Sequence, residues 1–184
     1  MRTVWRLALT AILVSVFSSL GISANAAGKL EVRFLYLEPG SVDPTYHTAM
    51  WIEDSDGKLV KTLFVSNELS STEYKSGKAC PDWVKQSGWA KAPKSQVDAV
   101  TGPTPNVGSG SMTFDLGQLG LPEGVYRFRF QVHITEGYNL LFQGQFSTGK
   151  SEQALKIETL YQPSKPDIGT DVVRDVRVYY YPAE

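Results

Sequence analysis

The sequence predicts an all-β protein, an antiparallel sandwich of about eight strands joined by turns and one long loop. Two observations predict this class. In several segments, apolar and polar residues alternate with a period of two, which is typical of a strand that buries one face. Segments rich in glycine, proline and serine separate these stretches, and no long amphipathic helix interrupts them.

The first three strands are expected at residues 30–36, 49–54 and 58–65. In the first, the apolar residues at positions 30, 32, 34 and 36 alternate with Glu31 and Arg33. The other two flank the turn sequence Ser55-Asp56-Gly57. Asp-Gly between apolar runs favours a hairpin, because both central residues of such a turn need positive φ.

The clearest strand covers residues 125–134. Its even-numbered residues are all apolar and predict the core face. Arg127, Arg129, Gln131 and His133 lie on the other face, which we expect to be the wetter one. Further strands are expected at residues 112–116, 139–146, 154–161 and 171–181.

Residues 66–110 form a connection that is unusually long for a compact domain, and such connections are mostly functional or disordered. Trp83 and Trp89 argue against disorder, and we expect them to pack the loop onto the sandwich; an aromatic wall for a planar ligand is the alternative. Cys80-Pro81-Asp82-Trp83 predicts the start of a short helix. The thiol of Cys80 is either activated by helix amides or buried, and the absence of a nearby His or second Cys in the sequence favours burial.

Residues 1–26 are typical of a cleaved signal peptide. Two arginines precede an apolar run at residues 7–20, and Ala24-Asn25-Ala26 supplies the small residues of a cleavage site. The run is shorter than the roughly 20 residues that cross a bilayer, and no cysteine stands at the cleavage site for lipid attachment. We therefore expect an exported, periplasmic protein of one domain, residues 27–184, that does not span a membrane after cleavage.

Charge and cysteine content exclude several classes of function. Without the two arginines of the predicted signal peptide, 16 basic residues face 19 acidic ones, so the mature chain lacks the positive charge on which most nucleic-acid binding depends. One cysteine cannot form an internal disulfide or a cysteine-rich metal site. Neither Gly-x-Ser-x-Gly nor His-x-x-x-His occurs, so hydrolase and zinc-enzyme chemistry are not indicated and no catalytic residue is predicted.

Two groups of residues offer metal-binding alternatives. His47 and Met50, with His133, carry imidazole and thioether groups that suit copper, although their spacing does not place them at one site. Carboxylates cluster within residues 53–56 at the tip of the first hairpin. They lack the spacing and the closing glutamate of a helix-loop-helix calcium loop, so a solvated turn is the better interpretation.

Several short motifs stand in a fixed order across nearly all of the predicted mature chain, at residues 50–58, 61–63, 83, 98–102, 121–126 and 136–138. Together they resemble a family of exported bacterial proteins known only as a domain of unknown function. The resemblance implies an immunoglobulin-like or fibronectin-III-like sandwich, similar to the flagellar-hook-capping domain. Members are often encoded beside a periplasmic flavin transferase and PepSY membrane proteins. The histidine that the family commonly has between Glu136 and Gly137 is missing, so no role for it is carried over.

One of these motifs, with the two residues after it, is similar to the acceptor motif of periplasmic flavin transferases, Asp-x-x-Ser/Thr-Gly-Ala-Thr. The resemblance implies a cofactor site formed by Asp98, Thr101, Gly102 and Thr104, with FMN joined to Thr104 through a phosphodiester. Such chemistry needs an accessible hydroxyl, and a glycine allows close approach to the backbone. Pro103 replaces the alanine of the motif and restricts the loop.

Two functions are consistent with these residues and motifs. With FMN attached, the protein is a small redox carrier of an electron-transfer system, and the resemblance implies a flavin transferase and a PepSY-type membrane protein as partners. The alternative is a non-enzymatic periplasmic binding module without a cofactor, in which residues 98–104 are an ordinary turn. The run Tyr179-Tyr180-Tyr181, with at least one ring on each face of its strand, favours docking of a partner protein.

Overall fold

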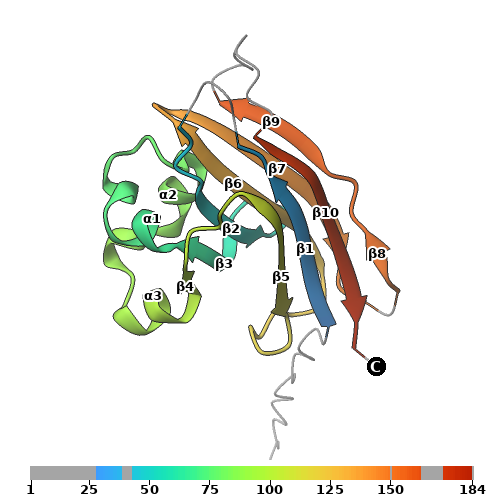
Figure 1. The fold of residues 1–184 in the computed structure, drawn as a ribbon. Helices are drawn as coiled ribbons and strands as arrows, with labels where there is room; N and C mark the ends of the chain where they lie inside the picture. The colour runs from blue at the N-terminus through green and yellow to red at the C-terminus, as the bar shows by residue number, and fades with distance from the viewer. Residues whose placement is uncertain (1–27, 39–42, 150, 163–171, 184) are drawn as a thin grey trace, which may run out of the picture.

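The computed structural model describes residues 28–38, 43–149, 151–162 and 172–183. The predicted β-sandwich is confirmed, because two sheets of mostly antiparallel strands pack face to face, with short helices beside them (Figure 1). The predicted signal peptide, residues 1–26, lies outside the described residues.

One sheet has four strands in the order β5-β1-β10-β8, and all its neighbours are antiparallel. Strands β1 and β10 form its centre, with Leu30 opposite Tyr180. A bulge shifts this register between Arg33 and Leu35, where Asp175 has a positive φ of 52°. The strands are β1 (Gly28–Tyr36), β5 (Gly108–Asp115), β8 (Gln153–Ala154) and β10 (Val173–Pro182).

The other sheet has six strands in the order β4-β3-β2-β6-β7-β9, and only β3 and β4 are parallel. The predicted hairpin joins β2 to β3, but its turn differs from the expected one, because Gly57 has a positive φ of 78° and Asp56 does not have a positive φ. The Oδ1 atom of Asp54 accepts hydrogen bonds from the amides of Asp56 and Lys58, which fixes the turn. The strands are β2 (His47–Glu53), β3 (Leu59–Ser66), β4 (Thr101–Gly102), β6 (Val125–Thr135), β7 (Tyr138–Ser147) and β9 (Glu158–Gln162).

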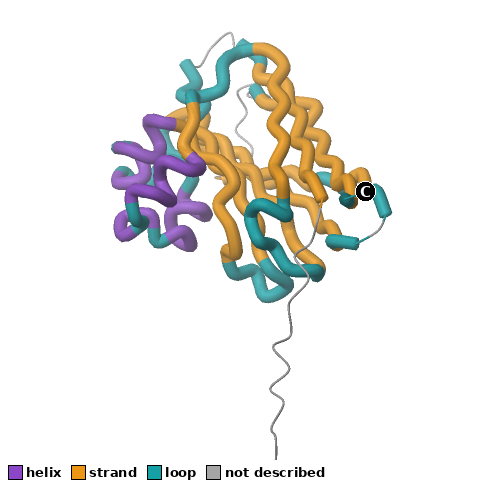
Figure 2. Tube along the Cα trace, turned by 90° about the horizontal axis from the view of Figure 1, so that it is seen from below, coloured by secondary structure: helices purple, strands orange, loops and turns teal. Residues whose placement is uncertain are grey.

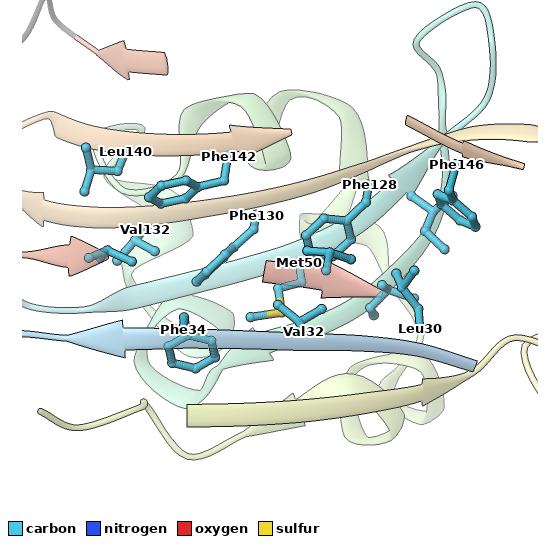
Figure 3. Packing of buried hydrophobic residues seen from close by; sticks show 14 of the residues in the cluster. Leu30, Val32, Phe34, Met50, Phe128, Phe130, Val132, Leu140, Phe142 and Phe146 are labelled. Atoms are coloured by element: carbon cyan, nitrogen blue, oxygen red, sulfur yellow. The ribbon is translucent and has the colours of Figure 1, made fainter. Parts of the chain in front are cut away.

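The core lies between the two sheets, where the apolar faces predicted by the alternation meet (Figure 3). Phe34 of β1 and Phe130 of β6 contact each other across the sandwich, with ring centroids 5.4 Å apart. Met50 of β2 is fully buried in the same layer. Burial of these large side chains supplies most of the free energy that holds the sheets together.

Short helices cover the outer face of the six-stranded sheet and gather on one side of the strands (Figure 2). The sequence predicts one short helix in the long loop, and the structure has three. No helix here exceeds seven residues, a length at which apolar periodicity cannot be recognised. The helical layer consists of α1 (Asn67–Ser71), α2 (Pro81–Ser87) and α3 (Lys94–Val100), with 3₁₀ turns at Glu73–Lys75 and Trp89–Lys91.

Trp83 and Trp89 pack this helical layer onto the sheet, as the sequence predicts. Their rings contact each other at 4.9 Å between centroids, and both side chains are buried. The indole Nε1 of Trp83 donates to Oγ1 of Thr62, and that of Trp89 donates to the carbonyl of Ser70. The second core around them also contains Ala49, Trp51, Val65, Leu69, Ala79, Cys80 and Leu141.

The prediction that the outer face of β6 is the wetter one is wrong at one end of the strand. Gln131 and His133 are buried there, whereas Arg127 and Arg129 are partly exposed. The helical layer covers this end, and Oε1 of Gln131 accepts hydrogen bonds from the amides at the start of α2. Alternation shows which face is less apolar, but it cannot show that polar side chains find buried partners in another segment.

The strand predicted at residues 154–161 is divided between the two sheets. Strand β8 pairs with β10, and β9 pairs with β7. Leu155 and Ile157, in the crossing between them, both pack against the core. The core-facing residues of the predicted strand therefore keep their positions against the core, although the pairing partner changes.

We expect Trp83→Ala to lower the free energy of unfolding by about 3–5 kcal/mol, because it leaves a cavity beneath the helical layer and removes the hydrogen bond to Thr62. Urea unfolding measures the effect. Val107→Ala is the matched control, since this apolar side chain is 53% exposed and its loss should change stability little. Equal effects of the two changes would contradict the assigned role of the second core.

Candidate functional site

The predicted flavin-acceptor residues lie where the helical layer returns to the sheet. Helix α3 carries Asp98, whose side chain is 58% exposed and forms an ion pair with Lys94 at 2.7 Å. The chain then enters β4, where Thr101 and Gly102 pair in parallel with the end of β3. Thr104 follows β4 in an irregular segment that leads to β5, and its side chain is half-buried.

The start of this acceptor segment, residues 98–104, is held closely against the sheet. A Cβ atom on Gly102 would lie 2.7 Å from a ring carbon of Phe64, so only glycine fits without displacing that ring. The hydroxyl of Thr101 is buried and has no hydrogen-bond partner among the described residues. The structure therefore fixes Thr101 and Gly102 on the sheet edge, and it gives no hydrogen bond between Asp98 and Thr104 among the described residues.

Two histidines lie side by side beneath the helical layer. His47 of β2 is the register partner of His133 of β6, and their rings stack at 5.8 Å between centroids. Nε2 of His47 lies 2.9 Å from a carboxylate oxygen of Glu68, and Nδ1 of His133 lies 2.8 Å from the hydroxyl of Thr45. This pair is not evident from the sequence, because only the register of β2 against β6 brings the two residues together.

Burial, together with the nearby His47 and Lys78, lowers the pKa of His133 to about 4. His133 is therefore neutral at physiological pH, and its ring accepts or donates single hydrogen bonds within the protein.

The copper alternative is not supported by this arrangement. Met50 faces the sandwich core, on the opposite side of β2 from His47. Within the described part of the chain, no group of three or more His, Cys, Asp or Glu side chains is placed to hold a metal ion.

Cys80 is fully buried, which is the alternative that its sequence context favours. Its Sγ atom lies 3.4 Å from the carbonyl of His47 and 3.5 Å from that of Gln131. Burial raises the pKa of the Cys80 thiol, so it stays protonated and is not a nucleophile in the folded protein.

Glu53 is a buried carboxylate, although the sequence predicts that it lies at a solvated hairpin tip. That prediction is correct for Asp56, which is exposed, and wrong for Glu53, which is only 1% exposed. Its carboxylate accepts hydrogen bonds from the indole of Trp51 and from Gln86 of α2, and it pairs with Arg129 at 3.1 Å. Glu53 shares a strand face with Trp51. Arg127 and Arg129 on the facing strand β6 are the sequence signal that could have identified the pairing of Glu53 with arginine.

The C-terminal tyrosines divide between the two faces of β10, as the sequence predicts. Tyr180 is buried in the core. Tyr179 and Tyr181 stack on the outer face at 6.3 Å between centroids, and the guanidinium of Arg33 lies 5.4 Å from the Tyr179 ring.

We expect His133 to make stability depend on pH. The unfolded chain takes up the imidazole proton near pH 6.5, whereas the folded protein takes it up only near pH 4. The free energy of unfolding is therefore highest above pH 6.5 and falls as the pH drops from 6.5 to 4. Urea unfolding over this range should show a shallower decline for His133→Gln, which keeps hydrogen-bonding groups without the charge change. Identical pH profiles would show that His133 is not the cause.

Comparison with known proteins identifies a family. The family model described as "Predicted periplasmic protein (DUF2271)" matches residues 30–162, which run from β1 to the end of β9. No curated protein and no solved structure matches the chain. Within the described residues, the helices are too short or too polar to cross a membrane. The chain belongs to DUF2271, a family of predicted periplasmic proteins of unknown function.

Proposed function

We propose that this protein is an exported, periplasmic accessory protein of a flavin electron-transfer system, and that it carries FMN covalently on Thr104. The observation that carries the proposal is the position of Thr104, a half-buried side chain just beyond a Thr-Gly pair that is fixed to the sheet. Export through residues 1–26 would bring the chain to the compartment where periplasmic flavin transferases act.

In the acceptor segment, Gly102 is fixed to the sheet, and several of the residues that follow it are exposed. Gly102 packs against Phe64 and pairs with β3. Beyond it, Pro103, Asn106 and Val107 are exposed. A modifying enzyme needs a substrate hydroxyl that is accessible and presented in few conformations. A short segment that is anchored at β4 and open around Thr104 meets both requirements.

The proposed attachment requires little of this chain's own side chains. Thr104 supplies the hydroxyl oxygen, which attacks the FMN phosphorus of a flavin dinucleotide held by the transferase. The phosphoric anhydride bond to the nucleotide half breaks, the nucleoside monophosphate leaves with the bonding electrons, and the threonine proton passes to water. Asp98 stays on α3, paired with Lys94. Attached FMN supplies one- and two-electron redox chemistry, while the sandwich supplies a fixed position. A periplasmic flavin transferase and a PepSY-type membrane protein are the proposed partners.

A non-enzymatic binding module is the second candidate. The observation that favours it is the outer face of the four-stranded sheet, where Tyr179 and Tyr181 stack beside Arg33. Tyrosine and arginine are enriched where proteins dock. A binding module needs neither a cofactor nor Thr104. A substitution at Thr104 therefore distinguishes the two functions, because only FMN attachment depends on this residue.

We expect the mature protein to gain the mass of FMN less one water, and in-gel flavin fluorescence, when it is co-expressed in the periplasm with a flavin transferase from the same genome. Thr104→Ala should remove both signals, because it removes the acceptor oxygen. Ser109→Ala is the matched control, since it removes an exposed hydroxyl from the same stretch. An unmodified mass, in cells where a known acceptor protein is modified, would overturn the proposal and favour the binding module.

Pro103→Ala tests whether proline slows attachment. Alanine restores the residue type of the acceptor motif and frees the backbone around Thr104, so the initial rate of FMN attachment should rise. Intact mass spectrometry over a time course measures this rate. A slower rate in the variant would show instead that proline helps to present Thr104.

A further inference from the structure

One flank of the sandwich, where the chain passes from one sheet to the other, is left uncovered by strands of the described residues. Strands β4 and β5 are the outermost strands of their sheets on this flank, and residues 103–107 connect them (Figure 1). Strand β4 pairs only with the last two residues of β3, Val65 and Ser66. Residues 59–64 of β3 and the whole of β5 are therefore sheet edges on the same flank. Thr104 lies in the connection that crosses it.

Apolar side chains along this flank are only partly covered. Large side chains at the centre of the sandwich are buried, because strands lie on both sides of them. Four side chains of β3 and β5 that pack against the core remain partly exposed, namely Val60, Phe64, Met112 and Phe114. Val107, in the connection itself, is the most exposed large apolar side chain of the described chain. The flank thus leaves apolar surface in water, which is unfavourable and marks a place where an apolar group fits.

Phe64 lies close to the proposed attachment point. Its ring packs against Gly102, where an added Cβ would lie 2.7 Å from a ring carbon. Thr104 is two residues further along the chain, so its Cα lies at most about 7 Å from that of Gly102. The ribityl phosphate arm of FMN is a chain of single bonds of about 1.5 Å and spans about 9 Å when it is extended. A flavin ring joined to Thr104 through this arm therefore reaches the side chain of Phe64.

Phe114 lies at the opposite end of the same flank. The connection enters β5 at Gly108, which is opposite Tyr36 at one end of β1, whereas Phe114 is opposite Leu30 near the other end. Strand residues rise about 3.3 Å each, so Phe114 lies about 20 Å along β5 from Gly108. Attachment at Thr104 therefore favours the part of the flank beside Phe64. Phe114 is a second partly exposed phenylalanine that serves as a matched comparison.

The isoalloxazine ring of FMN has one apolar end and one polar end. Its dimethylbenzene end carries no hydrogen-bonding group, whereas its pyrimidine end carries carbonyl and N–H groups that need hydrogen-bond partners or water. The aromatic side chain of Phe64 packs favourably with another aromatic ring. An apolar flank therefore suits the dimethylbenzene end, and the pyrimidine end is better left in water.

We propose that the isoalloxazine ring of FMN attached to Thr104 packs with its dimethylbenzene end against Phe64, at the end of the flank that the connection crosses. This inference rests on the proposed function, because the ring is brought to the flank only by its attachment to Thr104. Packing removes apolar surface of both the ring and the protein from water and holds the flavin in one position. The sandwich then binds the flavin as well as tethering it.

The test uses the mature protein made with a flavin transferase from the same genome. Intact mass first establishes attachment of FMN. Quenching of flavin fluorescence by iodide then measures how far the ring is exposed to solvent. The reference is the flavin peptide released from the same sample by proteolysis, which carries the same ring without the folded flank. We expect the intact protein to be quenched about twofold less than the peptide, because packing covers one end of the ring.

Two matched variants identify the part of the flank that the ring contacts. Phe64→Leu removes the aromatic ring but keeps an apolar side chain against the core, and it should raise iodide quenching toward the value of the flavin peptide. Phe114→Leu makes the same change at the far end of the flank and should leave quenching as in the unsubstituted protein. In the isotope-labelled protein, attachment of FMN should shift the amides of Leu63 and Phe64, relative to unmodified Thr104→Ala, and leave that of Phe114 unchanged.

The outcomes separate this inference from the proposed function. An unmodified mass would overturn both. A modified mass with equal iodide quenching of the intact protein and the flavin peptide would overturn the packing alone, and so would equal effects of the two phenylalanine substitutions. If Phe64→Leu is poorly folded, the amide shifts of the unsubstituted protein decide, since shifts confined to residues 103–107 would show that the ring does not contact Phe64.

Discussion

Every side chain of β2 is buried, because this strand lies between the sandwich core on one face and the helical layer on the other. Met50 and Ile52 pack between the sheets, whereas Ala49 and Trp51 pack against the helical layer. A strand buried on both faces cannot be covered by one apolar core alone. The rest of the structure therefore depends on the folding of residues 67–100 onto the sheet. Trp83 and Trp89 supply the contacts that hold this segment there.

Polar residues determine how the helical layer docks, because apolar contacts alone do not fix its register. Asn139 accepts a hydrogen bond from the amide of Cys80, and Gln131 accepts from the first amides of α2. Glu53 joins Gln86 of that helix to Arg129 of the sheet. A buried polar group without a hydrogen-bond partner costs free energy, so these contacts favour one placement of α2.

The segment that leaves the helical layer carries the proposed acceptor residue. After α3 the chain enters β4 at the edge of one sheet, passes Thr104, and enters β5 at the edge of the other. Edges and connecting segments are the parts of a sandwich that the core does not cover, and binding residues concentrate there. The half-buried Thr104 on this connection is therefore more accessible than Cys80, His47 and His133, which are buried.

The sequence by itself determined the sandwich, the first hairpin, the apolar face of β6 and the packing of both tryptophans, since these depend on local alternation, turn chemistry and side-chain size. Only the tertiary structure decided which polar residues are buried. His47 lies beside His133 because of the register of β2 against β6. Glu53 is buried because Gln86 and Arg129, which are distant from it in the sequence, contact its carboxylate. The division of residues 153–162 between two sheets was likewise decided by pairing partners that no local pattern encodes.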